Sequence, residues 1–568
     1  MVKLTEIIYN YKINFKMTAF GKFYFILILT LFTATVFPQV YQKNKEFNDQ
    51  KYFVSETQKA TDILHYDLSF DLDIKNKILN GIAILTAVKN QSGNPELTSG
   101  SEYELNFYDN MKINSVKINN QPAEYHRKKN RIFIKGTEIF SDTTTIEIEY
   151  YGTPQRGGFD GFVFGTVNGN SLVYNISEPN LASTFFPCDD DPADKALLDI
   201  KITNDSQFVS VSNGNLIEVK NNGEKKTYHY KTVYPISTYL IAVYSAPYKT
   251  FSDIYISLNE QDTMQIYYYV LSEHLDKGRI DFAGHLDYMK TLSKLFGEYP
   301  FIKEKYGVAE FLWNYGAMEN QTITGFAYNF INGNNFFEDI YVHELSHHWW
   351  GNSVGPKSWN DIWLNEGFAS YSEALYAEAK NGKDALKSKM LAKYSNYFRG
   401  TLYAPRDLFG ETVYDKGAWV LHMLRNEIGD SDFFNVLNTY YNTYKYSNAS
   451  TEDFKQVCET VSGKNLTKFF DQWVYNGTEN IYCTYYFETE RNSDSNAVTL
   501  YIEQKTKNYP EFHFNLEVEI FYKDSTSEKK DFLINKVNNK FNFTTDRKVE
   551  AILPDPESKL LAEFENEY

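Results

Sequence analysis

The chain is poor in cysteine and proline, and its positive charges are outnumbered by negative ones. Its three cysteines, Cys188, Cys458 and Cys483, allow at most one internal disulfide, so a disulfide scaffold is excluded and we expect buried thiols at these positions. Fifteen prolines among 568 residues provide little material for long linkers. The 57 Lys and Arg against 74 Asp and Glu leave a net charge of -17, which argues against a nucleic-acid-binding surface and favours encounters with cationic peptides.

Aromatic residues, in contrast, are abundant. They make up 17% of the chain, and so many rings would be difficult to keep in water, so the chain is predicted to be globular. At 568 residues it is long enough for about three or four domains of ordinary size.

One long apolar run lies near the N-terminus. Residues 23–37, FYFILILTLFTATVF, follow Lys22 and match the basic and apolar regions of a secretory signal. The run is short for a membrane span, which needs about 20 residues. Residues 1–38 are therefore predicted to be a signal peptide that exports the protein, with Met17 as an alternative start. A retained membrane anchor is the other interpretation, and membrane contact is expected only in that case.

Beyond the signal, a polar linker is expected over residues 39–60, followed by a region whose hydrophobic period is two. Apolar and polar residues alternate from residue 63, and similar segments recur to about residue 248 between clusters of Gly, Asn, Asp and Ser. Residues 61–249 are therefore predicted to form an all-β domain.

The spacing of apolar residues changes twice in the remainder of the chain. Residues 250–476 carry helix-spaced apolar residues, and Ser450 with Asp453 forms a capping pair. Helices are expected at 282–296, 384–398, 416–428 and 453–461. The period returns to two in residues 477–568, which predicts a small β-sandwich.

The segment VHELSHHWW at residues 342–350 is the first sign of chemistry. His343 and His347 would lie about 40° apart around a helix axis and about 6 Å apart along it, close enough to share one metal ion. Glu344 would lie beside the metal's open position, where it can accept a proton from water. Two imidazoles leave a catalytic zinc one protein ligand short, and Glu366, 19 residues beyond His347, completes the set.

Two neighbouring residues are expected to support these ligands. His348 points about 100° away from His347 on a regular helix, so packing or a hydrogen bond is expected rather than metal binding. Glu373 lies seven residues beyond Glu366 on the same helix face and is a candidate partner for a ligand histidine.

Four motifs, taken in order, carry a resemblance to a known family. They are Gly316-Ala317-Met318-Glu319-Asn320 (GAMEN), HELSHHWWGN at 343–352, WLNEGFASY at 363–371 and YDKG at 414–417. In order and spacing they resemble the zinc aminopeptidases typified by aminopeptidase N, and the resemblance runs from about residue 64 to the C-terminal β segment. It implies an α+β multidomain fold with an N-terminal all-β domain, a thermolysin-like α/β catalytic domain and a small C-terminal β-sandwich. It also implies one Zn²⁺ per chain.

The resemblance implies roles for the GAMEN loop and two further side chains. Glu319 matches a carboxylate that binds the substrate's α-ammonium, a charge that internal peptide bonds lack, and the loop backbone pairs with the peptide. Glu178 matches a second such carboxylate, although this chain has Ile176 and residues 183–184 (Ser-Thr) where the family often has Gln and an Arg pair. Tyr414 matches the tyrosine that stabilises the oxyanion.

Together these residues predict a zinc aminopeptidase that removes single residues from peptides with a free N-terminus. Zinc would acidify a bound water, and Glu344 would accept its proton and pass it to the leaving amine. Three alternatives use the same residues differently: an epoxide hydrolase-like enzyme acting on a lipid, an endopeptidase, and a non-catalytic adhesion or scaffold protein. Glu319 argues against the endopeptidase, and the complete ligand set argues against the scaffold.

Overall fold

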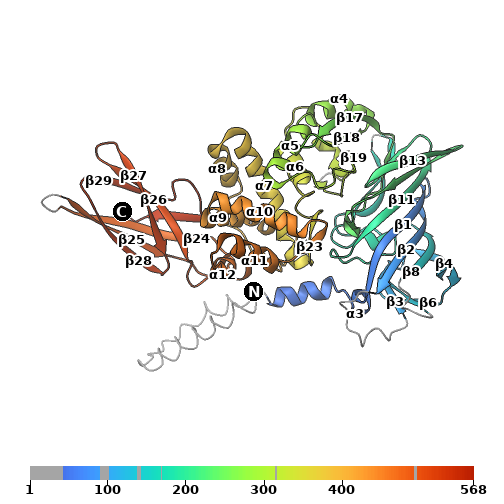
Figure 1. Cartoon of the computed structure of the whole chain (residues 1–568), viewed down its shortest axis with the longest axis horizontal. Coiled ribbons are helices and arrows are strands. Elements are labelled where there is room, and N and C mark those ends of the chain that lie inside the picture. The colour runs from blue at the N-terminus through green and yellow to red at the C-terminus, as the bar shows by residue number, and fades with distance from the viewer. Residues whose placement is uncertain are drawn as a thin grey trace, which may run out of the picture.

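Three regions of different secondary structure follow one another along the molecule (Figure 1). The computed structural model describes residues 42–89, 102–136, 143–167, 169–313, 316–491 and 495–567. N-terminal strands lie at one end, helices in the middle and C-terminal strands at the other end. The predicted fold class is confirmed.

The N-terminal region is built on a large, mainly antiparallel sheet in which β1 and β11 pair in parallel. Its main path is β13-β14-β11-β1-β2-β8-β4-β5, namely Asn215–Asn222, Lys225–Lys231, Lys195–Asp205, Thr61–Asp73, Ile78–Lys89, Thr144–Gly152, Lys112–Ile118 and Gln121–Pro122. Tyr66, Leu68 and Phe70 of β1 are buried while the residues between them are partly exposed, as the period of two predicts.

Smaller sheets complete the region and lead to the next one. One has the order β12-β16-β10-β9 (Val209–Val211, Tyr244–Ala246, Asn170–Ile176, Gly161–Val167), and another the order β3-β7-β6 (Glu102–Asn106, Arg131–Lys135, Tyr125–Arg127). Strand β10 ends two residues before Glu178, so this sheet positions that carboxylate.

The middle region combines a mixed sheet with helices. The sheet order is β17-β18-β19-β21-β20, namely Lys249–Ile256, Thr263–Val270, Tyr306–Phe311, Thr324–Ala327 and Ala317–Met318, so β20 lies at an edge. The helices are α4 (Leu275–Asp281), α5 (His285–Phe296), α6 (Glu338–Ser346), α7 (Trp363–Asn381), α8 (Lys383–Ala392), α9 (Gly417–Ile428), α10 (Asp430–Tyr444), α11 (Thr451–Ser462) and α12 (Thr467–Phe470).

Local signals account for some of these helix boundaries. The Ser450–Asp453 capping pair before α11 is confirmed as a reciprocal capping box. The prediction of one helix over 384–398 is wrong at its C-terminal end, because α8 stops at Ala392 and Lys393 turns inward to pair with Glu373 at 2.7 Å.

The C-terminal region consists of two sheets. Their orders are β28-β25-β24-β30 (Asn538–Thr545, Asn496–Gln504, Ile481–Arg491, Ala562–Asn566) and β27-β26-β29 (Ser527–Ile534, Phe514–Tyr522, Val549–Pro554). Leu516, Val518 and Ile520 of β26 are fully buried, and the intervening residues are partly exposed. The alternation in this part of the sequence therefore reports a buried sheet face.

The segment ahead of β1 is not the polar linker that its composition predicts. Residues 42–51 are helical, and α3 (Glu56–Lys59) begins with a capping box. Asn48 is buried and donates to the Asn360 side chain at 3.2 Å and the Pro405 carbonyl at 2.9 Å, so the segment is anchored on the middle region. The predicted signal at 1–38 lies outside the described residues.

Two further expectations concern membranes and thiols. Within the ranges that the structure describes, no helix combines the length and hydropathy needed to cross a bilayer. Cys188, Cys458 and Cys483 are all buried and unpaired, which confirms the expectation of buried thiols.

Candidate zinc site and amine pocket

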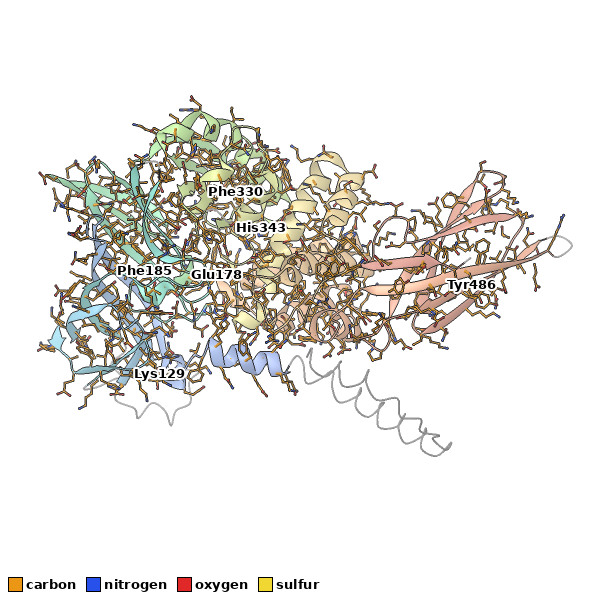
Figure 2. The ribbon with its side chains drawn as sticks, turned by 180° about the vertical axis from the view of Figure 1, so that it is seen from behind. Lys129, Glu178, Phe185, Phe330, His343 and Tyr486 are labelled. Atoms are coloured by element: carbon orange, nitrogen blue, oxygen red, sulfur yellow. The ribbon has the colours of Figure 1, made fainter. Side chains whose placement is uncertain are left out.

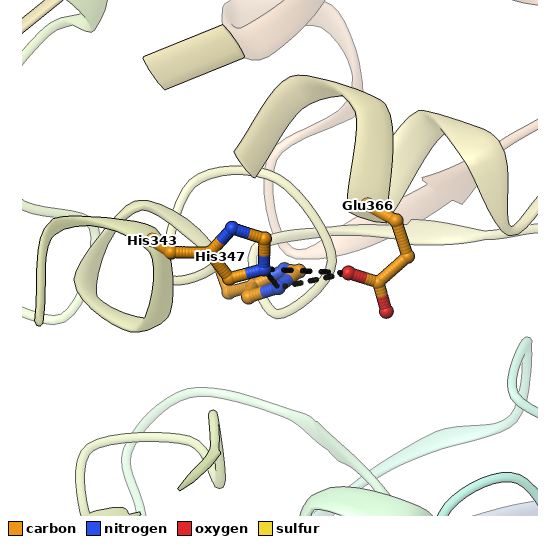
Figure 3. Close-up of side chains that lie close together, drawn as sticks. All are labelled: His343, His347 and Glu366. Carbon is orange, nitrogen blue, oxygen red and sulfur yellow. Dashed lines mark hydrogen bonds and ion pairs between the residues drawn. The ribbon is translucent and has the colours of Figure 1, made fainter. Parts of the chain in front are cut away.

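Helices α6 and α7 bring three candidate metal ligands together. His343 lies in the last turn of α6, His347 directly follows that helix, and Glu366 lies in the first turn of α7. Glu366 Oε2 is 3.5 Å from His343 Nε2 and 3.3 Å from His347 Nε2, and the two imidazole nitrogens are 3.1 Å apart (Figure 3). A tetrahedral zinc at about 2.0–2.1 Å from each ligand requires separations of about 3.3 Å, so the three residues fit this ion.

The electrostatics of the three residues favour a cation. Burial alone would raise the pKa of Glu366, but the charge of His347 and hydrogen bonds from both histidines lower it to about 2. Burial would likewise lower the pKa of His343, but Glu366 and Glu373 raise it to about 10. The carboxylates therefore stabilise positive charge at this point, which is what a divalent ion supplies.

Outer contacts orient both imidazoles. Glu373 Oε1 lies 2.9 Å from His343 Nδ1, and the Trp350 carbonyl lies 3.0 Å from His347 Nδ1. Each contact holds the proton on Nδ1 and leaves the Nε2 lone pair for the metal. The expectation that Glu373 supports a ligand histidine is confirmed, and Lys393 in turn holds Glu373.

Replacing Glu373 with alanine is expected to weaken zinc binding about 10- to 100-fold, because the His343 ring loses the acceptor that sets its tautomer and orientation. Competition with a chromogenic chelator would measure the affinity. The matched control is Lys393→Ala, which removes the other partner of Glu373 and leaves the acceptor in place. An unchanged affinity for Glu373→Ala would contradict the assignment.

Two more carboxylates face the ligand set. Oxygens of Glu319 and Glu344 lie within 4.8 Å of each other and of a ring nitrogen of His347. Glu344 is 7% exposed, and burial raises its pKa to about 8 although His343 lowers it. A carboxylate held this way beside the metal position is suited to exchange protons with water.

Glu178 and Glu319, the two carboxylates that the family resemblance assigns to the substrate's amine, form a buried pair that we call the amine pocket. Figure 2 places Glu178 near His343, where the N-terminal region meets the helices. Glu178 is 5% and Glu319 4% exposed, and the Oε1 atom of each has no hydrogen-bond partner among the described residues. Burial and then the charge of Glu319 raise the pKa of Glu178 well above its usual range. Two buried carboxylates that repel each other are a site for a positively charged group.

Tyr414 completes the site. It lies in a π-helical turn, Thr412–Lys416, and its ring stacks against His343 at a centroid distance of 5.9 Å. Burial, and then the negative charge of Glu366, raises the pKa of its phenol well above 10.0, so the group stays protonated and can donate a hydrogen bond.

Two side-chain hydrogen bonds that the sequence analysis did not predict hold the GAMEN loop. Tyr244 donates to the Asn320 side chain, and Asn352 donates to the Glu319 carbonyl at 2.7 Å. Asn352 stands at the end of the HELSHHWWGN motif and could have been suspected, whereas no signal marks Tyr244 among 46 tyrosines. Together they fix the position of the Glu319 backbone.

His348 links the ligand helix to the same loop. Its Nε2 accepts the Thr322 N–H at 3.0 Å, and Thr322 has a φ of 63°, an unusual conformation for a β-branched residue. The expectation of a hydrogen-bonding role for His348 is confirmed.

The N-terminal region also braces the site directly. Lys195 of β11 donates to the carbonyls of Asn352 and Ser353 at 2.7 and 3.0 Å. The segment that follows the ligand helix is therefore attached to a residue of another region.

Comparison with known proteins identifies this architecture. The peptidase M1 N-terminal domain matches residues 63–240, and the peptidase family M1 domain matches residues 285–473. The chain belongs to the peptidase M1 family. The resemblance to the zinc aminopeptidases is thereby confirmed, and the matched ranges contain the ligand set, Glu344, Glu178, the GAMEN loop and Tyr414.

The relatives of this M1 chain include several named aminopeptidases. It is 28% identical over 436 residues to "Probable aminopeptidase 2" of Sulfurisphaera tokodaii, covering 72% of this chain and 53% of that protein. The chain spans about half the length, or less, of the curated relatives it matches.

Solved structures show the same fold. The M1 zinc metallopeptidase of Deinococcus radiodurans aligns with a TM-score of 0.65 at 24% identity, covering 74% of this chain and 95% of that one. Aminopeptidase A of Legionella pneumophila aligns with a TM-score of 0.77 at 20% identity, covering 90% of this chain and 60% of that one.

Proposed function

We propose that this M1 chain is a zinc aminopeptidase that removes single residues from peptides with a free N-terminus and holds one zinc ion. The observation that carries the proposal is the pair of buried carboxylates, Glu178 and Glu319, whose Oε1 atoms have no partner among the described residues. They lie beside a ligand set that fits zinc, and an α-ammonium would supply the missing charge.

His343, His347 and Glu366 would hold the metal, which when bound would polarise water and the substrate carbonyl. Glu344 accepts the proton of the attacking water and delivers it to the leaving amine. The Tyr414 phenol donates a hydrogen bond to the oxygen on which negative charge develops.

The amine pocket restricts cleavage to the first peptide bond. Glu178 and Glu319 hold the α-ammonium, and the edge strand β20 is placed to pair with the peptide backbone. We further propose that residues 1–38 direct export, on the basis of the apolar run at 23–37.

One assay tests the exopeptidase function. The chain from residue 39 onward is incubated with a free-amine peptide and its N-acetylated twin, with and without a zinc chelator, and products are followed by mass spectrometry. We expect a chelator-sensitive ladder of single-residue losses from the free peptide alone. Internal cuts in both peptides would point to an endopeptidase and contradict the roles of Glu178 and Glu319. No cleavage of either would favour the lipid-substrate or scaffold alternatives.

Tyr414→Phe is expected to lower kcat about 10²- to 10³-fold with little change in KM, because the lost hydrogen bond forms to the oxyanion and not to the ground-state carbonyl. Steady-state kinetics on the free-amine peptide would measure both constants. Tyr397→Phe, at a side chain that is 75% exposed, is the matched control. Full activity in Tyr414→Phe would remove Tyr414 from the mechanism.

A further inference from the structure

A cavity of about 610 Å³ lies beside the Tyr414 ring. Three segments that contain none of the family motifs contribute most of its wall. The wall includes Arg156, Phe159 and Asp160 from the loop between β8 and β9, Tyr174 of β10, Trp313 after β19, and Phe409 and Tyr414. An apolar cavity of about 150 Å³ accommodates benzene, so this one has room for a large side chain.

Three aromatic rings lie in this wall, and the Phe159 ring contacts the other two. The Phe159 ring lies 5.6 Å from Trp313 and 4.8 Å from Phe409, both measured between ring centroids. All three side chains are only partly buried although they pack against the core. Such rings keep exposed faces against which another aromatic ring can stack edge-to-face.

The two charged residues of the wall form an ion pair with each other. Arg156 forms an ion pair with Asp160, and the Tyr174 hydroxyl donates to the other Asp160 oxygen at 2.7 Å. Among the described lining residues, these are the two with formal charge. The cavity therefore offers no free carboxylate to a lysine or arginine side chain, despite the net charge of -17.

The position of the cavity relates it to one residue of the substrate. The α-carbon of the first residue must lie between the ammonium, at Glu178 and Glu319, and the carbonyl, at Tyr414. Tyr414 lines the cavity, and Tyr174 lies on the strand that leads to Glu178. The Trp313 ring also covers Gly316, the first GAMEN residue, with a ring atom 2.9 Å from where a Cβ would be.

We propose that this cavity binds the side chain of the substrate's N-terminal residue and selects large, uncharged aromatic side chains. The proposal rests on the proposed aminopeptidase function and adds the substrate class. Phe159, Trp313 and Phe409 determine the specificity.

Binding of amino alcohols tests the cavity without any need for turnover, because these compounds have a free amine and no amide bond. Isothermal titration of the zinc-loaded protein with L-phenylalaninol is expected to give an affinity about 10- to 100-fold higher than with L-alaninol, as burial of a phenyl ring predicts. L-Lysinol should bind no more tightly than L-alaninol. Equal affinities for phenylalaninol and alaninol, or a preference for lysinol, would overturn the proposal.

Variants connect the preference to the rings. Trp313→Ala and Phe409→Ala should each remove most of the preference for phenylalaninol, while unchanged alaninol binding shows that the amine pocket is intact. Phe521→Ala, on the remote strand β26, should keep the full preference. If both cavity variants kept the preference, the site of selection would lie elsewhere and the proposal would fail.

Kinetics on Phe-Ala-Ala and Ala-Ala-Ala separate this proposal from the one on which it rests. Cleavage of both peptides with equal kcat/KM would overturn the cavity's role and leave the aminopeptidase function standing. Selective binding of phenylalaninol without cleavage of either peptide would support the cavity and contradict the function.

Discussion

Replacement of Glu344 by glutamine is expected to lower kcat by about 10²- to 10⁴-fold while the protein still binds one zinc ion. Glutamine keeps the size and hydrogen-bonding capacity of the side chain but cannot accept a proton from water. Glu344 lies beside His347 without belonging to the His343–His347–Glu366 set, so its neutralisation should spare the metal. Metal analysis and steady-state kinetics on one preparation would measure both quantities.

Glu338→Gln is the matched control for this variant. Glu338 stands at the start of the same helix, α6, and accepts a hydrogen bond from the Tyr288 hydroxyl at 3.0 Å, away from the ligands. Its activity should stay near that of the unmodified protein. If Glu344→Gln retained most of its turnover, another group would have to be the base.

Glu366→Ala is expected to bind zinc about 10²- to 10³-fold more weakly and to lose activity without added metal. Zinc sites with four protein ligands bind the ion with a free energy of about 10–16 kcal/mol, so one ligand contributes roughly a quarter of that free energy. Removal of Glu366 also takes away a negative charge that favours a cation next to His343 and His347. Equilibrium dialysis against a buffered zinc concentration would give the affinity.

Glu378→Gln provides the comparison on the same helix. Glu378 lies further along α7 and pairs with Arg425 at 2.6 Å, so its replacement should affect stability and leave zinc affinity unchanged. A Glu366→Ala protein with full zinc affinity would mean that the third ligand is another residue.

The metal set was predictable because its chemistry imposes a local spacing. His343 and His347 must be one helical turn apart to share an ion, and this repeat is visible in the sequence without knowledge of the fold. Glu178 was accessible only through family resemblance, because it comes from a different region and nothing around it indicates that it reaches the metal set. The outer contact of Glu373 follows from helix periodicity once Glu366 is placed.

The rest of the fold and site could not be predicted, because it depends on contacts between residues far apart in the sequence. The polar residues at 39–60 resemble a linker, but the Asn48 amide pairs with Asn360, 312 positions away, and no local pattern reports such a contact. The cavity wall poses the same difficulty. Phe159, Trp313 and Phe409 are separated by about a hundred or more residues. Nothing distinguishes them from the chain's other phenylalanines and tryptophans until the segments meet.

The amine pocket is divided between two parts of the molecule, since Glu178 follows β10 of the N-terminal region and Glu319 follows β20 of the middle region. Lys195 holds these parts together next to the metal ligands. In the proposed function, recognition of a free amino terminus would therefore depend on both regions being joined. A molecule in which the N-terminal strands had come away would keep the three candidate ligands, Glu344 and Glu319. It would lose Glu178, and with it half of the negative charge that we propose distinguishes the first peptide bond from all others.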